Sequence, residues 1–151
     1  MNQTNNVGAL VGRFLLALIF LISGFHKLMN PSGTVQLMSS HGIPLVWLAY
    51  LATVVVELGF AFLVMIGFRT RIVAILMLLW FIPVTLIFHV VPYRDAVAHG
   101  QAQMATMQAA NYMKNLSIMG GLLLLASFGA GAFSFDGRRT VDGASDARHA
   151  A

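Results

Sequence analysis

A single carboxylate, Glu57, lies near the centre of a long apolar segment, and it is the residue best placed to do chemistry. A charge at the centre of a membrane helix costs about 2.5–3.5 kcal/mol, whereas each Leu, Ile, Val or Phe contributes about 0.3–0.6 kcal/mol in favour of insertion. The surrounding apolar residues therefore still carry this segment into a bilayer. There, Glu57 must face the protein interior and either pair with a cation or stay protonated.

The expected partner of Glu57 is Arg13, which lies inside the first apolar run of the chain. If the two helices are antiparallel, Arg13 lies about 9 Å and Glu57 about 15 Å from the same membrane face. A long Arg side chain can bridge the difference of about 6 Å. The sequence thus predicts an intramembrane ion pair. Such a pair either handles protons or a cofactor, or only locks the two helices together.

A second group of polar residues is expected at the opposite end of the helices. Cations and amide donors beside the start of a helix suit an anion or the carbonyl oxygens of a quinone, whose ring would lie near Phe25 and Phe88. The alternative is that these residues only anchor helix ends at the membrane interface. The members of this candidate quinone or anion site are Lys27, His89, Lys114 and Asn115.

Four apolar runs must position these residues, and they extend over residues 7–28, 43–68, 72–91 and 112–132. Each approaches or exceeds the roughly 20 residues that a helix needs to cross the hydrocarbon core. The runs are continuous rather than alternating, so helices rather than barrel strands satisfy their backbone groups. We predict an all-α, integral membrane four-helix bundle, up-down-up-down, over residues 1–136, followed by a mobile polar tail over 137–151.

Proline and glycine divide the runs. Pro44 falls in the first turn of the second helix, Pro83 is expected to kink the third, and Pro92 is expected to end it. The longest connection, residues 92–111, forms either a short helix at the interface or an extension of the fourth helix.

The composition is typical of an integral membrane protein. Of 151 residues, 58% are hydrophobic and 9% are charged, compared with about 25% charged in soluble domains. The net charge of +4 comes from Lys and Arg at the ends of apolar runs, which favours membrane anchoring over nucleic-acid binding. Without Cys we expect no haem or iron–sulfur ligation. Met104, Met107, Met113 and His99 fit no copper motif, so no metal is predicted.

Basic residues also predict the orientation. Four crossings place the N-terminus, the turn containing Arg69 and Arg71, and the C-terminal tail on one side with six basic residues, against three on the other. Because Lys and Arg concentrate in cytoplasmic segments, both termini are expected in the cytoplasm.

Short motifs follow one another at characteristic spacing over residues 11–136. They are Arg13, Gly24-Phe25-His26-Lys27-Leu28, Asn30-Pro31, His41-Gly42-Ile43-Pro44, Val56-Glu57-Leu58-Gly59, Gly67-Phe68-Arg69-Thr70-Arg71, Leu86-Ile87-Phe88-His89, Met113-Lys114-Asn115-Leu116, Gly120-Gly121 and Gly131-Ala132-Phe133-Ser134-Phe135-Asp136. Together they resemble the DoxX family of small bacterial membrane proteins. The resemblance implies a four-helix bundle in the bacterial inner (cytoplasmic) membrane, with recurrent polar positions at Arg13, Lys27, Glu57, Arg71, His89 and Asn115.

The resemblance implies less about activity. Relatives named DoxD are linked to thiosulfate:quinone oxidoreductase, and other members are linked to membrane redox or oxidative-stress complexes. Our leading hypothesis is therefore a membrane subunit of a redox assembly, itself catalytic or not, that binds quinone or docks a quinone-using redox partner. One alternative is a non-enzymatic scaffold that docks a partner or forms a homo-oligomer. The other is a small-solute or proton pathway in which Glu57 titrates.

Overall fold

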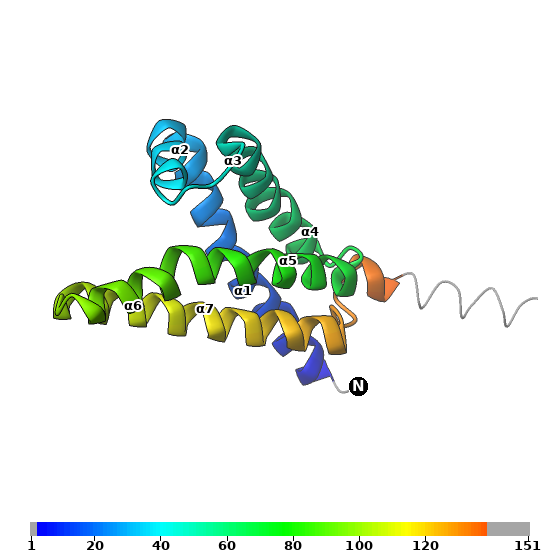
Figure 1. The fold of residues 1–151 in the computed structure, drawn as a ribbon. Helices are drawn as coiled ribbons and strands as arrows, with labels where there is room; N and C mark the ends of the chain where they lie inside the picture. The colour runs from blue at the N-terminus through cyan, green and yellow to red at the C-terminus, as the bar shows by residue number, and fades with distance from the viewer. Residues whose placement is uncertain (1–2, 139–151) are drawn as a thin grey trace, which may run out of the picture.

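A computed structural model describes residues 3–138, which form helices and turns with no strand among them (Figure 1). The all-α class predicted from the continuous apolar runs is confirmed. Two π-helical segments, η1 and η2, each join two α-helices into one longer helix. The elements in chain order are α1 (Gln3–Met29), α2 (Pro31–Ser40), α3 (Val46–Val54), η1 (Val55–Phe60), α4 (Ala61–Ile66), α5 (Thr70–Thr85), η2 (Leu86–Val90), α6 (Val91–Ala98) and α7 (Ala102–Phe128).

Within the described residues, three stretches are long and apolar enough to cross a membrane: Asn6–Met29, Val46–Ile66 and Thr70–Ala98. Leu15, Trp47 and Leu79 are among the many large apolar side chains exposed on them, a surface that suits lipid contact. Helix α7 has 27 residues, but its first half contains Gln103, Gln108, Asn111, Lys114 and Asn115. The fourth crossing, the up-down order across the membrane and the cytoplasmic termini stay predictions.

Helix α1 packs antiparallel to the continuous α3–η1–α4 helix. Near the end of α1, a Cβ atom on Gly24 would lie 2.8 Å from Leu58 Cδ2 and 3.0 Å from Glu57 Cβ. Near its start, Arg13 Nε donates a hydrogen bond to the Met65 carbonyl at 3.1 Å. Because Gly24 has no side chain, the two backbones approach closely. This close approach brings the last turns of α1 beside Glu57.

Helix α7 runs back along the α5–η2–α6 helix (Figure 1). The antiparallel register follows from three pairs of neighbours: Arg71 with Gly129, Thr85 with Asn115, and His89 with Gln108. An apolar core fills the space where these helices meet α1 and α4. In it, Phe20 of α1 packs edge-on against Phe81 of α5, with ring centroids 5.2 Å apart.

Helix α2 was not predicted from the sequence, because the stretch between the first two apolar runs was interpreted as a loop. The local signal for it is nevertheless present. Asn30 accepts a hydrogen bond from the Gly33 backbone N–H at 3.1 Å, and Pro31 occupies the first turn. A capping Asn followed by Pro is a favoured helix start, because Pro needs no N–H partner there. The helix covers the space between α1 and α3.

The prediction that Pro92 ends the third helix is wrong, since the helix continues through Pro92 to Ala98. The residues just before Pro92 form the π-helical segment η2. The wider π turn changes the carbonyl spacing that would otherwise bring the proline ring against the preceding turn. Pro83 lies inside α5, as the sequence predicted.

The connection over residues 92–111 is mostly helical. Gly100, at φ +66°, makes the turn between α6 and α7, a backbone conformation that favours Gly. Since α7 begins at Ala102, the structure has the alternative in which the fourth helix is extended. Residues 139–151 of the predicted tail lie outside the described residues.

Candidate functional site

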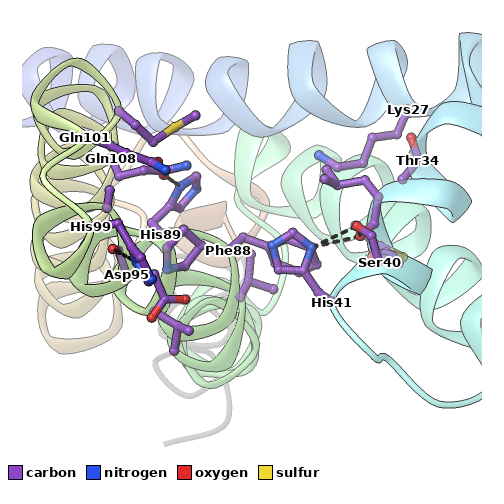
Figure 2. Close-up of a pocket in the computed structure, with 18 of the residues that line it drawn as sticks. Lys27, Thr34, Ser40, His41, Phe88, His89, Asp95, His99, Gln101 and Gln108 are labelled. Carbon is purple, nitrogen blue, oxygen red and sulfur yellow. Dashed lines mark hydrogen bonds between the residues drawn. The ribbon is translucent and has the colours of Figure 1, made fainter.

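A cleft of about 780 Å³ lies between α2 on one side and η2 and α6 on the other (Figure 2). Residues of α1, η1 and the start of α7 complete its walls. The volume is within the range of small-molecule sites. The polar side chains that line the cleft are Lys27, Thr34, Ser40, His41, Thr53, Glu57, His89, Asp95, His99, Gln101 and Gln108.

Glu57 forms an ion pair with Lys27 at one wall of this cleft. Lys27 Nζ lies 2.9 Å from Glu57 Oε1 and 2.7 Å from Oε2, and it also donates to Ser23 Oγ at 2.6 Å. The Glu57 side chain is 9% exposed and that of Lys27 is 27% exposed. Three acceptors for the three ammonium hydrogens make this a fully hydrogen-bonded pair, which is the condition for holding charge in a low-dielectric interior.

The predicted Arg13–Glu57 ion pair is therefore wrong. Glu57 packs at the level of Gly24, which lies 11 residues beyond Arg13 and about 16 Å further along α1. The sequence estimate measured both residues from one assumed membrane face. The actual register between the two helices is set by the close contact at Gly24, which no sequence pattern specified.

Arg13 instead joins three segments at the other end of the bundle. Besides Met65, its guanidinium donates to the carbonyls of Ala130 and Phe133, and only 3% of the residue is exposed. These bonds tie the end of α4 and the chain after α7 to α1. The sequence left open whether Arg13 serves proton or cofactor chemistry or only links helices. This geometry favours a link between helices, with backbone carbonyls rather than a carboxylate as the partners of Arg13.

The predicted turn containing Arg69 and Arg71 lies at this same end, at the start of α5. Asp136 accepts hydrogen bonds from the backbone N–H groups of Arg69 and Thr70, both at 2.8 Å. The carboxylate thus satisfies donors at a helix start that have no partner within the helix. Arg69 and Arg71 also line a cleft of about 700 Å³ beside Phe128.

The four residues predicted for a quinone or anion site do not come together. Lys27 and His89 line the cleft, but Lys114 is exposed and donates to Asn111 Oδ1 at 3.3 Å. Asn115 is 3% exposed and donates to Thr85 Oγ1 at 3.1 Å, away from the cleft. Phe88 lines the cleft, whereas Phe25 is 57% exposed on the outside of α1. The sequence reasoning treated one end of the bundle as one site, although residues of that end face different directions.

Several cleft residues were missed, namely His41, Asp95, His99, Gln101 and Gln108. His41 lies at the end of α2, and the others lie in α6, in the turn after it and in the first part of α7. Recognising the Asn30-Pro31 helix start would have indicated that His41 ends a helix rather than lying in a loop. Figure 2 shows His41 next to Phe88, where the end of α2 meets η2; their ring centroids are 4.8 Å apart.

The two residues most able to do chemistry in this cleft both lie in π-helical segments. Glu57 belongs to η1 and His89 to η2. A π turn inserts one extra residue and changes the direction of the side chains around it, and such turns are frequent at functional sites. Here the extra residues turn a carboxylate and an imidazole toward the same cavity.

An apolar pocket of about 180 Å³ adjoins the cleft between α3 and α5. It shares Met38, Thr53, Val84 and Phe88 with the cleft, and Trp80 and Pro83 are among its other walls. The Trp80 indole N–H is buried without a partner in the part of the chain that the structure describes. A polar cavity beside an apolar pocket suits an amphiphilic molecule. Among residues 3–138, no group of three or more His, Asp or Glu side chains is placed to hold a metal ion.

Comparisons with known proteins agree on one family. The DoxX family model matches residues 8–90, which include Lys27, His41, Glu57 and His89 but not α6 or α7. The inner membrane protein YphA of Escherichia coli K12 is 42% identical over 129 residues, covering 85% of this chain and 88% of YphA. The inner membrane protein YqjF of the same organism is 32% identical over 136 residues, covering 90% of this chain and 95% of YqjF.

A third relative has a name that refers to a redox reaction. The putative oxidoreductase CatD of Bacillus subtilis 168 is 34% identical over 76 residues, which cover 50% of this chain and 55% of CatD. No solved structure matches the chain.

Proposed function

Because this chain belongs to the DoxX family and is a multi-pass protein of the inner membrane, we propose that it is a membrane subunit of a redox assembly and binds a quinone head group. The cleft between α2 and α6 is the proposed site. The partial similarity to a protein named as a putative oxidoreductase supports the redox assignment.

The observation that carries the proposal is that the polar cleft and the apolar pocket lie side by side and share four lining residues. A quinone combines a planar ring bearing two carbonyl oxygens with an apolar tail. The cleft of about 780 Å³ offers His, Gln and carboxylate groups to the ring substituents, and Phe88 lies at the boundary of both cavities. The pocket of about 180 Å³ offers only apolar walls and the Thr53 side chain to the first part of the tail.

The ion pair at the cleft wall supports a role in proton transfer. Reduction of a quinone to a hydroquinone takes up two electrons and two protons. Glu57 can supply or accept a proton at the edge of the cleft, and Lys27 holds its carboxylate in place through two short hydrogen bonds. In this proposal the electrons come from a partner redox protein, and the chain provides the binding site and the proton route.

We also propose the orientation in which all four long helices cross the membrane. Helix α7 packs along α5, and its second half is apolar. Both chain ends and the basic residues Arg69 and Arg71 then lie on the cytoplasmic side. The cleft opens at the opposite, periplasmic end of the bundle.

Tryptophan fluorescence offers a direct test, because quinones quench nearby tryptophans. The chain has two Trp residues, so Trp47→Phe leaves Trp80, at the wall of the apolar pocket, as the single reporter. We expect saturable quenching when a short-chain ubiquinone is titrated into this variant in lipid nanodiscs. His89 Nδ1 holds the side chain of Gln108, whose amide N–H groups can donate to a quinone carbonyl. Adding His89→Ala to the variant releases this donor and should therefore weaken the apparent affinity by roughly tenfold.

The matched control is His26→Ala, which removes an exposed histidine outside the cleft. It should leave the titration unchanged. Quenching that rises linearly without saturation, and equally in the His89→Ala and His26→Ala proteins, would show partition into lipid rather than binding and would contradict the proposal.

A further inference from the structure

We infer that the cleft prefers the reduced, hydroxyl-bearing hydroquinone over the oxidised quinone. Most side-chain donors of the cleft are already hydrogen-bonded within the protein, so the cleft presents mainly acceptors to a ligand. The inference rests on the proposed function and names the form of the ligand that the same site favours. The two forms share ring and tail, so hydrogen bonding at the oxygen atoms must distinguish them.

The first observation concerns the donors of the cleft. All three ammonium hydrogens of Lys27 point at Ser23 and Glu57. The hydroxyl groups of the lining residues each donate to a backbone carbonyl of their own helix or its start, and their hydrogens are therefore engaged. These bonds are Thr34 to Asn30 at 3.0 Å, Ser40 to Leu37 at 2.8 Å, and Thr53 to Ala49 at 2.8 Å.

The second observation concerns the histidines. His41 Nδ1 lies 2.9 Å from the Leu37 carbonyl, and His99 Nδ1 lies 2.8 Å from the Asp95 carbonyl (Figure 2). Since a carbonyl oxygen only accepts, Nδ1 carries the hydrogen in both rings. The Nε2 atom of each neutral ring is then a lone-pair acceptor. No side chain among residues 3–138 contacts either Nε2 atom by a hydrogen bond.

His89 follows the same pattern, because its Nδ1 lies 2.9 Å from Gln108 Oε1. With the amide oxygen as acceptor, His89 Nε2 also presents a lone pair. The carboxylates of Glu57 and Asp95 add further acceptors to the lining. The side-chain donors that remain in the cleft are the amide N–H groups of Gln101 and Gln108. Acceptors therefore outnumber donors on the surface that a ligand meets.

A quinone carbonyl can only accept hydrogen bonds, and it would meet lone pairs at most positions of this lining. A hydroquinone hydroxyl can donate to an imidazole Nε2 or to a carboxylate. Each such bond is worth roughly three- to tenfold in affinity. A tenfold preference for the reduced form raises the potential of the bound two-electron couple by about 30 mV. The site would thus favour electron transfer onto its quinone.

Three ligands that share one short tail test the inference by calorimetry in nanodiscs, with oxygen excluded. They are a hydroquinone, the corresponding quinone, and the bis-O-methyl ether of the hydroquinone, which keeps the ring but has no donor. We expect the hydroquinone to bind roughly tenfold more tightly than the quinone. The ether should bind no more tightly than the quinone.

Two variants assign the preference to named acceptors. His41→Phe keeps an aromatic ring beside Phe88, whereas His99→Phe changes a more exposed position. At least one of them should weaken hydroquinone binding by roughly three- to tenfold more than it weakens quinone binding. His26→Phe, outside the cleft, is the matched control and should change neither.

The outcomes separate the inference from the function on which it rests. Saturable binding of the quinone as tight as that of the hydroquinone would overturn the inference and leave the proposed function standing. An ether that binds as tightly as the hydroquinone, or a preference unchanged in both variants, would also overturn it. Binding of none of the three ligands to the wild-type protein would refute the proposed function itself.

Discussion

Replacing Lys27 by Met should destabilise the protein more than replacing Glu57 by Gln, because the two residues are unequally buried. Lys27→Met leaves the Glu57 carboxylate, at 9% exposure, without its cation. Removing one partner of a buried pair costs about 3–5 kcal/mol. A carboxylate can escape by taking up a proton, which for glutamate at pH 7 costs about 4 kcal/mol and limits the effect. We therefore expect a loss of about 3–4 kcal/mol in the free energy of unfolding.

The reverse change, Glu57→Gln, leaves a lysine that is 27% exposed and still bonded to Ser23. Its expected cost is about 1–2 kcal/mol, because the ammonium keeps one partner and can reach solvent. In the double variant no uncompensated charge remains. A double-mutant cycle should therefore give a coupling energy of about 2 kcal/mol between the two positions.

The assay is reversible unfolding in mixed micelles, followed by far-UV circular dichroism as the fraction of denaturing detergent rises. Lys114→Met, at an exposed position, is the matched control and should stay within about 0.5 kcal/mol of wild type. A second cycle pairs Glu57→Gln with Arg13→Met. Coupling below about 0.5 kcal/mol in the Lys27 cycle, or larger coupling in the Arg13 cycle, would refute the assignment of the ion pair.

Two further predictions concern helix packing and the turn before α5. Gly24→Ala adds a Cβ 2.8 Å from Leu58 Cδ2 and should lower the free energy of unfolding by about 1–3 kcal/mol. The control Gly8→Ala places its Cβ where it meets no neighbouring atom within 4 Å and should leave stability unchanged or raise it. Thermal unfolding compares the two variants, and equal midpoints would contradict the close contact at Gly24. Asp136→Ala removes the acceptor of two backbone N–H groups and should lower the free energy of unfolding by about 1–2 kcal/mol. The amides of Arg69 and Thr70 should then exchange their hydrogens faster. Unchanged protection at both amides would exclude a capping role for Asp136.

The two π-helical segments connect the fold to the candidate site. Without the extra residues of η1 and η2, the side chains beyond each segment would turn by about 100° relative to those before it. Glu57 and His89 lie within these segments, where the change in direction takes place. The same η2 segment allows the helix to pass through Pro92, so the wall that carries Asp95 and His99 is an extension of the third long helix.

Much of the architecture followed from solvation alone. Continuous apolar runs can satisfy their backbone only as helices in lipid, and this reasoning predicted the all-α fold and the membrane environment. The same reasoning required Glu57 to face a partner inside the protein, which it does. The family and the inner membrane were predicted from the resemblance of the short motifs. Helix α2 and the passage through Pro92 were missed because each depends on a few residues, a cap and a π turn, that hydropathy does not detect.

The sequence by itself determined that a carboxylate inside an apolar segment needs either a cation or a proton, because an unpaired charge in a low-dielectric interior is strongly unfavourable. It did not determine which of the two alternatives holds, or which cation is the partner. That choice belongs to the tertiary structure, where the contact at Gly24 sets the register of α1 against η1 and brings Lys27, not Arg13, within 3 Å of Glu57. The direction of each polar residue at the end of the bundle was likewise decided by helix phase, which shifts by one residue at each π turn and so cannot be extrapolated along an ideal helix.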